Sequence, residues 1–250
     1  MLIAILIAML PAIVLMIYIF KKDRLEKEPK GLLFKLMLFG ALFSFIPAVL
    51  EGIGDYILQA RFGKASVLYY IVEAFFVVAL SEEWFKRMIL KRKTWSDPNF
   101  NCSFDGIVYA AYVSLGFALL ENLLYVFGGS LFDSLSTGLL RAVTAIPAHF
   151  FNAVFMGMYY GRAKERQLRG DTAGMNRNMK LSLWVPVCLH GFYDACAFIG
   201  GSFLTIVFYI FLIALYIISF RTVKRESAED RYLIGGFDVE PEQPEQPYRY

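Results

Sequence analysis

Long apolar runs, each close to the length of a membrane-spanning helix, constrain the fold of this chain more than any other feature. A helix needs about 20 mostly apolar residues to cross the roughly 30 Å hydrocarbon core of a bilayer. Seven segments meet this requirement, at residues 2–20, 31–50, 67–90, 104–127, 137–160, 180–199 and 203–220. Only 19% of the residues are charged, against roughly 25% in soluble domains. The sequence therefore predicts an all-α, polytopic membrane protein, a bundle of about seven transmembrane helices.

The connections between these segments alternate between ones that are rich in Lys and Arg and ones that contain few or none. Lys and Arg number five in 21–30, two in 51–66, five in 86–93, none in 128–136, six in 161–180, none in 200–202 and three in 221–225. Basic connections stay on the cytoplasmic side of a membrane. The pattern predicts an N-terminus outside and a cytoplasmic C-terminus.

We expect residues 1–225 to form a single transmembrane domain, with a functional core at about 67–200. The acidic stretch 226–250 contains PEQPEQP and few large apolar residues, which predicts a disordered cytoplasmic tail. No basic residue precedes 2–20 and no small-residue cleavage site follows it, so it is interpreted as an anchor helix rather than a signal peptide. The three cysteines show no CxxC spacing, and no feature favours nucleic-acid binding.

Four consecutive apolar segments carry polar groups that lipid would not tolerate at depth. Ionisable groups inside a membrane normally face a protein interior or a wet cavity, and they are functional candidates by default. The candidate catalytic residues are Glu82, Glu83, Glu121, His149, His190 and Asp194, with Lys86, Asn122 and Asn152 in support. The spacings of three and four residues, from His149 to Asn152 and from His190 to Asp194, place both polar groups of those two segments on one helix face.

The predicted depths of these groups differ. At about 1.5 Å per residue, Glu83 lies about 12 Å from the cytoplasmic boundary if Lys91 marks it. Counted from Asp105, Glu121 lies about 24 Å deep, nearer to the level of Asp194 than to that of Glu83.

Acidic side chains and imidazoles in a confined wet cavity suit the activation of water for attack on a carbonyl. A buried carboxylate can take a proton from water, and histidine or asparagine donors can stabilise the oxyanion. GxSxG and HExxH are absent, so direct attack by water is favoured and no cofactor is required.

Two alternatives stay open. One is a metal-dependent hydrolase, in which a divalent ion such as zinc is held by the histidines and carboxylates. Adjacent helical residues point about 100° apart, so we do not expect Glu82 and Glu83 both to bind one ion. The other alternative is a non-catalytic scaffold protein, whose polar helices bind the membrane segments of partner proteins.

Three short motifs resemble those of the PrsW family. Glu82-Glu83-x-x-Lys86 is similar to its EExxK element, Phe117-x-x-x-Glu121 to its FxxxE element, and His190-x-x-x-Asp194 to its final histidine element. The resemblance spans about residues 67–200, and the first helices and the tail are less distinctive.

The resemblance implies a glutamic-type intramembrane endopeptidase, related to the type II CAAX prenyl proteases and to the Aph-1 subunit of gamma-secretase, which illustrates the scaffold alternative. It further implies a bacterial plasma membrane location and a single-pass membrane substrate, an anti-sigma factor given its first (site-1) cut. By that analogy Glu82 and Glu83 supply the catalytic carboxylate, with His190 and His149 assisting. A first cut near the outer face contrasts with the depth predicted for the glutamates.

Overall fold

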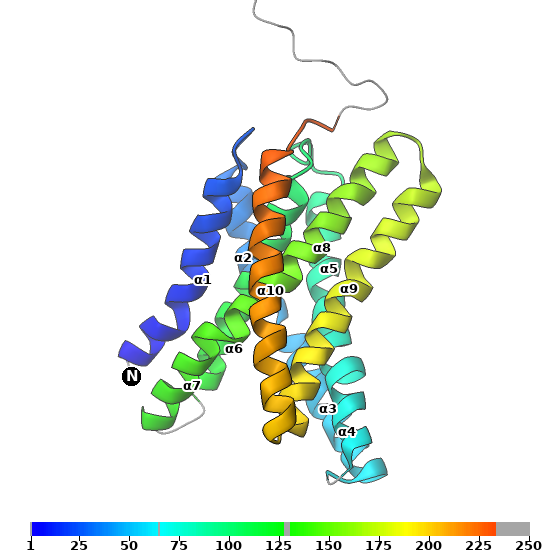
Figure 1. Ribbon diagram of the computed structural model, residues 1–250. Coiled ribbons are helices and arrows are strands. Elements are labelled where there is room, and N and C mark those ends of the chain that lie inside the picture. The colour runs from blue at the N-terminus through cyan, green and yellow to red at the C-terminus, as the bar shows by residue number, and fades with distance from the viewer. Residues whose placement is uncertain (1, 65, 128–130, 234–250) are drawn as a thin grey trace, which may run out of the picture.

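The computed structural model describes residues 2–64, 66–127 and 131–233, which form helices without any strand. In chain order the helices are α1 (Leu2–Lys22), α2 (Lys30–Phe43), α3 (Phe45–Phe62), α4 (Val67–Val72), the π-helix η1 (Glu73–Ala79), α5 (Leu80–Thr94), α6 (Asp105–Phe127), α7 (Leu131–Val143), α8 (Ala145–Leu168), α9 (Thr172–Ile199) and α10 (Ser202–Ala228). They run up and down in one bundle (Figure 1).

The bundle confirms the predicted fold class. Six helical stretches are long and apolar enough to cross a membrane. The seventh predicted segment is the continuous run of α4, η1 and α5, whose apolar part is interrupted by Glu73, Glu82 and Glu83. Several helices extend beyond their predicted ends, because a count of apolar residues detects only the part inside the hydrocarbon core. Thus α3 continues to Phe62 through the predicted outer loop 51–66, and α8 and α9 take up most of 161–180.

Two membrane segments are each divided by the same local sequence, a hydroxyl residue three positions before a proline. Ser44 separates α2 from α3 and precedes Pro47, while Thr144 separates α7 from α8 and precedes Pro147. Proline has no N–H to give to the carbonyl four residues earlier, so a helix bends or breaks there. At the second break the freed carbonyl of Val143 accepts a hydrogen bond from Tyr216 Oη at 2.9 Å. Another helix thereby satisfies the backbone group that lipid could not.

Helix α6 lies at the centre of the bundle, between α1 and α2 on one side and α8 on the other (Figure 1). Glycines permit this close packing. A Cβ atom on Gly40 would collide with the backbone of Val113, and one on Gly106 would lie 2.6 Å from the carbonyl oxygen of Gly157. Small residues let membrane helices approach closely, and here they bring the polar faces of α6 and α8 together.

A π-helical turn, η1, immediately precedes α5. Its hydrogen bonds join residues five apart rather than four, and such turns often occur beside functional sites. Gly54 of α3 and Gly191 of α9 pack against η1, where added Cβ atoms would overlap Val77 and Phe75. The turn is therefore held on both sides directly before Glu82 and Glu83.

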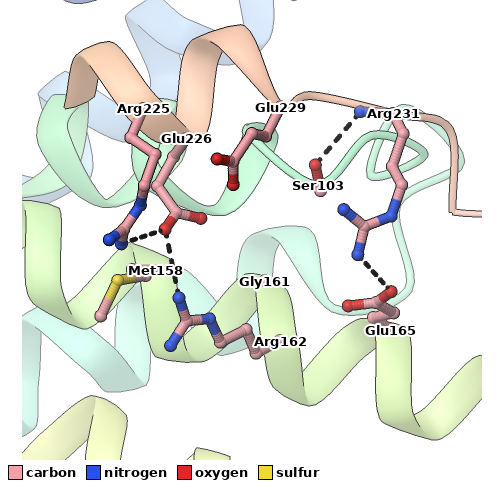
Figure 2. A pocket seen from close by; sticks show the side chains of 9 residues that line it. All are labelled: Ser103, Met158, Gly161, Arg162, Glu165, Arg225, Glu226, Glu229 and Arg231. Carbon is pink, nitrogen blue, oxygen red and sulfur yellow. Dashed lines mark hydrogen bonds and ion pairs between the residues drawn. The ribbon is translucent and has the colours of Figure 1, made fainter. Parts of the chain in front are cut away.

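The end of the bundle where α5 and α10 finish is called the basic end below, because the Lys- and Arg-rich connections lie there. Residues 229–233 dock on it. The Leu233 amide donates to the Asn101 carbonyl at 2.6 Å, and Arg231 pairs with Glu165 at 2.6 Å (Figure 2). The first part of the predicted tail, 226–233, therefore belongs to the folded body, since α10 continues to Ala228. The remainder, 234–250, lies outside the described residues.

Three buried carboxyl groups meet at the same end. Asp23, Glu28 and Asp105 are at most 4% exposed. Glu28 accepts a hydrogen bond from Tyr109 Oη at 2.6 Å, and Asp105 accepts from the Cys102 amide at 2.6 Å. Burial raises the pKa of Asp23 to about 6 and the pKa of Glu28 to about 7. These groups therefore take up protons well above the usual range of carboxyl groups.

Candidate active site

The ammonium group of Lys86 lies at the centre of the predicted polar cluster. Its Nζ donates to Glu82 Oε2 at 2.9 Å and to Glu83 Oε1 at 2.8 Å, and it lies 3.0 Å from His149 Nδ1. Lys86 and Glu83 are completely buried, and Glu82 is 4% exposed. Spacings of three and four residues on α5 bring both carboxylates to one ammonium.

The two glutamates differ in accessibility. Glu83 Oε1 also bonds His190 Nδ1 at 2.9 Å, while Glu83 Oε2 is buried without a hydrogen-bond partner in the described part of the chain. Glu82 uses only Oε2 for Lys86, which leaves Oε1 free among the described residues. Glu82 is therefore the carboxylate available to a water molecule, and Glu83 is the one that positions its neighbours.

His149 links this cluster to α6. Its Nε2 lies 2.8 Å from Glu121 Oε2. Since Lys86 can only donate, His149 Nδ1 must accept, and the proton of a neutral ring then lies on Nε2 and is donated to Glu121. The depth count had separated Glu121 from Glu83, but the structure joins Glu121 to the same cluster. The breaks and tilts of the helices make distance along a helix a poor measure of depth.

His190 completes the cluster from α9. Its Nε2 lies 3.2 Å from Asp194 Oδ2, one helical turn further on. The rings of His149 and His190 are 5.6 Å apart between centroids. Both histidines and all four predicted carboxylates are thus connected, directly or through Lys86.

Two charged residues at the site were missed by sequence reasoning. Arg141 of α7 pairs with Glu121 at 2.8 Å and donates from Nε to Asn122 at 2.7 Å. Glu51 of α3 accepts from Ser81 Oγ at 3.4 Å, and its charge interacts with those of Glu82, Glu121 and Asp194. The sequence did carry a signal for Arg141, because it is a basic residue inside the apolar segment 137–160. Glu51 had been placed in a loop because the apolar run ends at residue 50.

The supporting asparagines have different surroundings. Asn122 is buried and accepts from Arg141. Asn152 is 2% exposed, and its Oδ1 has no hydrogen-bond partner among the described residues. A buried acceptor without a donor is costly, so this oxygen is available to a ligand or water.

Two overlapping sets of side chains offer ligand atoms for a metal ion, all within 4.8 Å of one another in each set. They are Glu82, Glu121 and His149, and Glu82, Glu83 and His190. Imidazole nitrogen and carboxylate oxygen are ligands that suit zinc. The expectation that adjacent glutamates would not bind one ion stays a prediction, but the geometry does not favour it. The flexible side chains of Glu82 and Glu83 converge although their Cβ atoms diverge.

A membrane-spanning helical bundle that gathers carboxylates and imidazoles in its buried interior is the arrangement that an intramembrane hydrolase requires. Comparison with known sequences gives the family. A family model described as "PrsW family intramembrane metalloprotease" matches residues 28–219. The chain therefore belongs to this family of intramembrane proteases.

Curated relatives agree with this assignment. "Protease PrsW" of Oceanobacillus iheyensis is 33% identical over 86% of this chain and 92% of its own length. The Clostridioides difficile protein of that name is 32% identical over 88% and 90%, and the Bacillus subtilis protein is 34% identical over 74% and 78%. No solved structure matches the chain.

The geometry explains the motifs that carried the resemblance. Lys86 of the EExxK element lies over the ring of Phe117, 4.4 Å from its centroid, and Phe117 begins the FxxxE element. Glu121, which ends that element, binds His149. The phenylalanine therefore covers the ammonium by a cation–π contact, while the glutamate orients an imidazole.

Proposed function

We propose that this protein is an endopeptidase that hydrolyses a peptide bond in a single-pass membrane protein, by water activated at Glu82. The observation that carries the proposal is the convergence of Glu82, Glu83, Glu121, His149 and His190 in one buried cluster inside the bundle. Buried ionisable groups in a membrane are costly, and chemistry on a peptide bond accounts for them.

Glu82 acts as the general base. Lys86 Nζ donates to Glu82 Oε2 and fixes the position of the carboxylate, and the free Oε1 accepts a proton from water that attacks the scissile carbonyl. In the described residues, no serine or cysteine side chain bonds either imidazole. His149 donates its Nε2 proton to Glu121 and His190 Nδ1 bonds Glu83, so each imidazole would have to turn from its carboxylate before it donates to the oxyanion or to the leaving amine. Glu83, Glu121 and Asp194 orient these groups through the contacts given above.

A divalent metal ion fits the same site. The cluster contributes four carboxylates against the two permanent cations Lys86 and Arg141, and such an excess of negative charge is costly in a low-dielectric interior. Either set of three side chains described above would hold the ion, with His149 Nδ1 or a glutamate oxygen released from Lys86. A bound ion of this kind lowers the pKa of water and polarises a carbonyl. The family description "metalloprotease" favours this second candidate.

For the substrate and topology, we propose an anti-sigma factor with one membrane segment, given its first cut by a protein whose N-terminus is outside and whose C-terminus is cytoplasmic. The substrate class is what the resemblance of the EExxK, FxxxE and final histidine elements implies, and the alternating basic connections support the orientation. The plasma membrane of a bacterium is the corresponding location.

The test uses purified full-length protein in liposomes with a single-pass membrane substrate. We expect Glu82→Gln to lower the cleavage rate at least about 100-fold, because the amide keeps the shape but cannot accept the proton. Cleavage by Glu82→Gln at the normal rate would refute the assignment of the base. Activity that survives exhaustive chelation supports Glu82 alone, whereas loss on chelation and recovery with stoichiometric zinc supports the metal site.

A further inference from the structure

A pocket of about 360 Å³ lies between α5 and α9 near the basic end of the bundle. Its lining consists of the basic side chains Arg87 and Lys180, the amide Asn176, and Met179, Leu183 and Trp184. No acidic residue lines it. We propose that this pocket binds the phosphate headgroup of an anionic phospholipid, a proposal that does not depend on the proteolytic function.

The charge of the pocket is the first argument. The Arg87 guanidinium gives one hydrogen bond in the described structure, from Nη1 to the Met179 carbonyl at 3.1 Å, so most of its N–H donors lack an acceptor there. Lys180 is exposed and has no ion-pair partner among the described residues. Two cations without a carboxylate are matched by a phosphodiester, whose oxygens accept charge-assisted hydrogen bonds.

A second polar pocket at the basic end provides a contrast. In the pocket of about 330 Å³ drawn in Figure 2, Arg162 pairs with Glu226 at 3.1 Å and Arg231 pairs with Glu165 at 2.6 Å. The protein itself neutralises the arginines there. In the pocket between α5 and α9, by contrast, no acidic residue neutralises Arg87 and Lys180, so an anionic ligand can do so.

The position of the pocket identifies a lipid as the source of the phosphate. Trp184 follows Lys180 by one helical turn and is 49% exposed, and tryptophan near a basic residue is typical of the membrane–water interface. Leu183, between them in sequence, is 8% exposed and faces the bundle. A headgroup beside Arg87 and Lys180 would thus extend its acyl chains along the apolar side of Trp184. The charge pattern assigns this end to the cytoplasmic leaflet, where anionic lipids attract basic residues.

The bound lipid would connect the two helices that carry the polar cluster. Arg87 directly follows Lys86 on α5, and Lys180 lies on the same helix as His190. A ligand that binds only the folded state stabilises it in proportion to its occupancy. The lipid is therefore expected to raise the unfolding temperature of the protein.

The experiment compares three probes on purified full-length protein in detergent, by native mass spectrometry and thermal unfolding. The probes are dioctanoyl phosphatidylglycerol, dioctanoyl phosphatidylcholine and inorganic phosphate. We expect phosphatidylglycerol to bind more tightly than the other two and to raise the unfolding temperature. Equal binding of the two lipids, or phosphate binding as tight as phosphatidylglycerol, would overturn the proposal of an anionic lipid.

The variant for the test is Lys180→Gln, because this exposed side chain makes no contact on which folding depends. Its affinity for phosphatidylglycerol should fall about fivefold, the value typical of one basic residue at an anionic membrane surface. Arg87→Gln together with Lys180→Gln should weaken binding further. The matched control is Arg92→Gln, an exposed arginine of α5 outside the pocket, whose affinity should be unchanged. Equal affinities of Lys180→Gln and Arg92→Gln would refute the site.

Discussion

Replacing Lys86 by methionine tests whether its ammonium group holds the polar cluster together. Methionine has a similar length and flexibility but no charge. The change leaves Glu82 Oε2 and His149 Nδ1 without their shared donor, while Glu83 keeps its bond to His190 at 2.9 Å. Removing one partner of a buried ion pair costs about 3–5 kcal/mol. Because Glu83 remains partly paired, we expect the free energy of unfolding to fall by about 3 kcal/mol.

The measurement is reversible unfolding of the full chain in mixed micelles by titration with sodium dodecyl sulfate. Lys91→Met is the control, because Lys91 is exposed on the same helix and surface changes usually alter stability by less than about 0.5 kcal/mol. Adding Glu82→Gln to Lys86→Met removes one unpaired charge and should recover part of the loss, since contacting residues couple by about 0.5–3 kcal/mol. If Lys86→Met were as stable as Lys91→Met, the central role given to the ammonium would be refuted.

Three further outcomes are expected. Arg141→Gln should lower the cleavage rate about 10- to 100-fold, as loss of an orienting partner does, by releasing Glu121; a wild-type rate would contradict this. The raised pKa values of Asp23 and Glu28 mean that the folded state binds their protons more tightly. The free energy of unfolding should therefore fall by up to about 1.4 kcal/mol per pH unit for each group, as the pH rises from 3.8 to about 6 for Asp23 and from 4.5 to about 7 for Glu28, and Glu28→Gln should flatten the curve. Reporter domains should respond as cytoplasmic after residue 97 and as external after residue 64, and the reverse result would invert the proposed topology.

The number and order of the membrane segments could be predicted from the sequence because lipid requires long apolar runs, and apolar runs are visible in one dimension. Their ends and breaks could not. The break at Ser44 could not be predicted, because a proline such as Pro47 can bend a membrane helix without dividing it. The end of α3 at Phe62 could not be predicted either, because a helix can continue into water when its residues are polar. The docking of 229–233 depends on partners at least 66 residues away in the sequence, which composition does not reveal.

Most residues of the candidate site could be predicted from the sequence, but most of the contacts between different helices could not. Helical spacing gave the pairing of Glu82 with Lys86 and of His190 with Asp194. The link between Glu121 and His149 depends on how closely α6 and α8 pack, which glycines determine in three dimensions. Arg141 escaped notice because its role depends on a carboxylate on another helix.

The π-helical turn from Glu73 to Ala79 can be regarded as a one-residue insertion that the helix has absorbed. Each π hydrogen bond encloses one residue more than an α hydrogen bond, so the extra residue is accommodated within the turn instead of rotating everything that follows. Removal of a single residue from this stretch would convert α4, η1 and α5 into one regular α-helix, with Glu82 still facing His190. Removal of two residues would turn the glutamate pair by about 100° away from the histidines. In the evolution of related chains, the loss of one residue should therefore be tolerated here, and the loss of two should not.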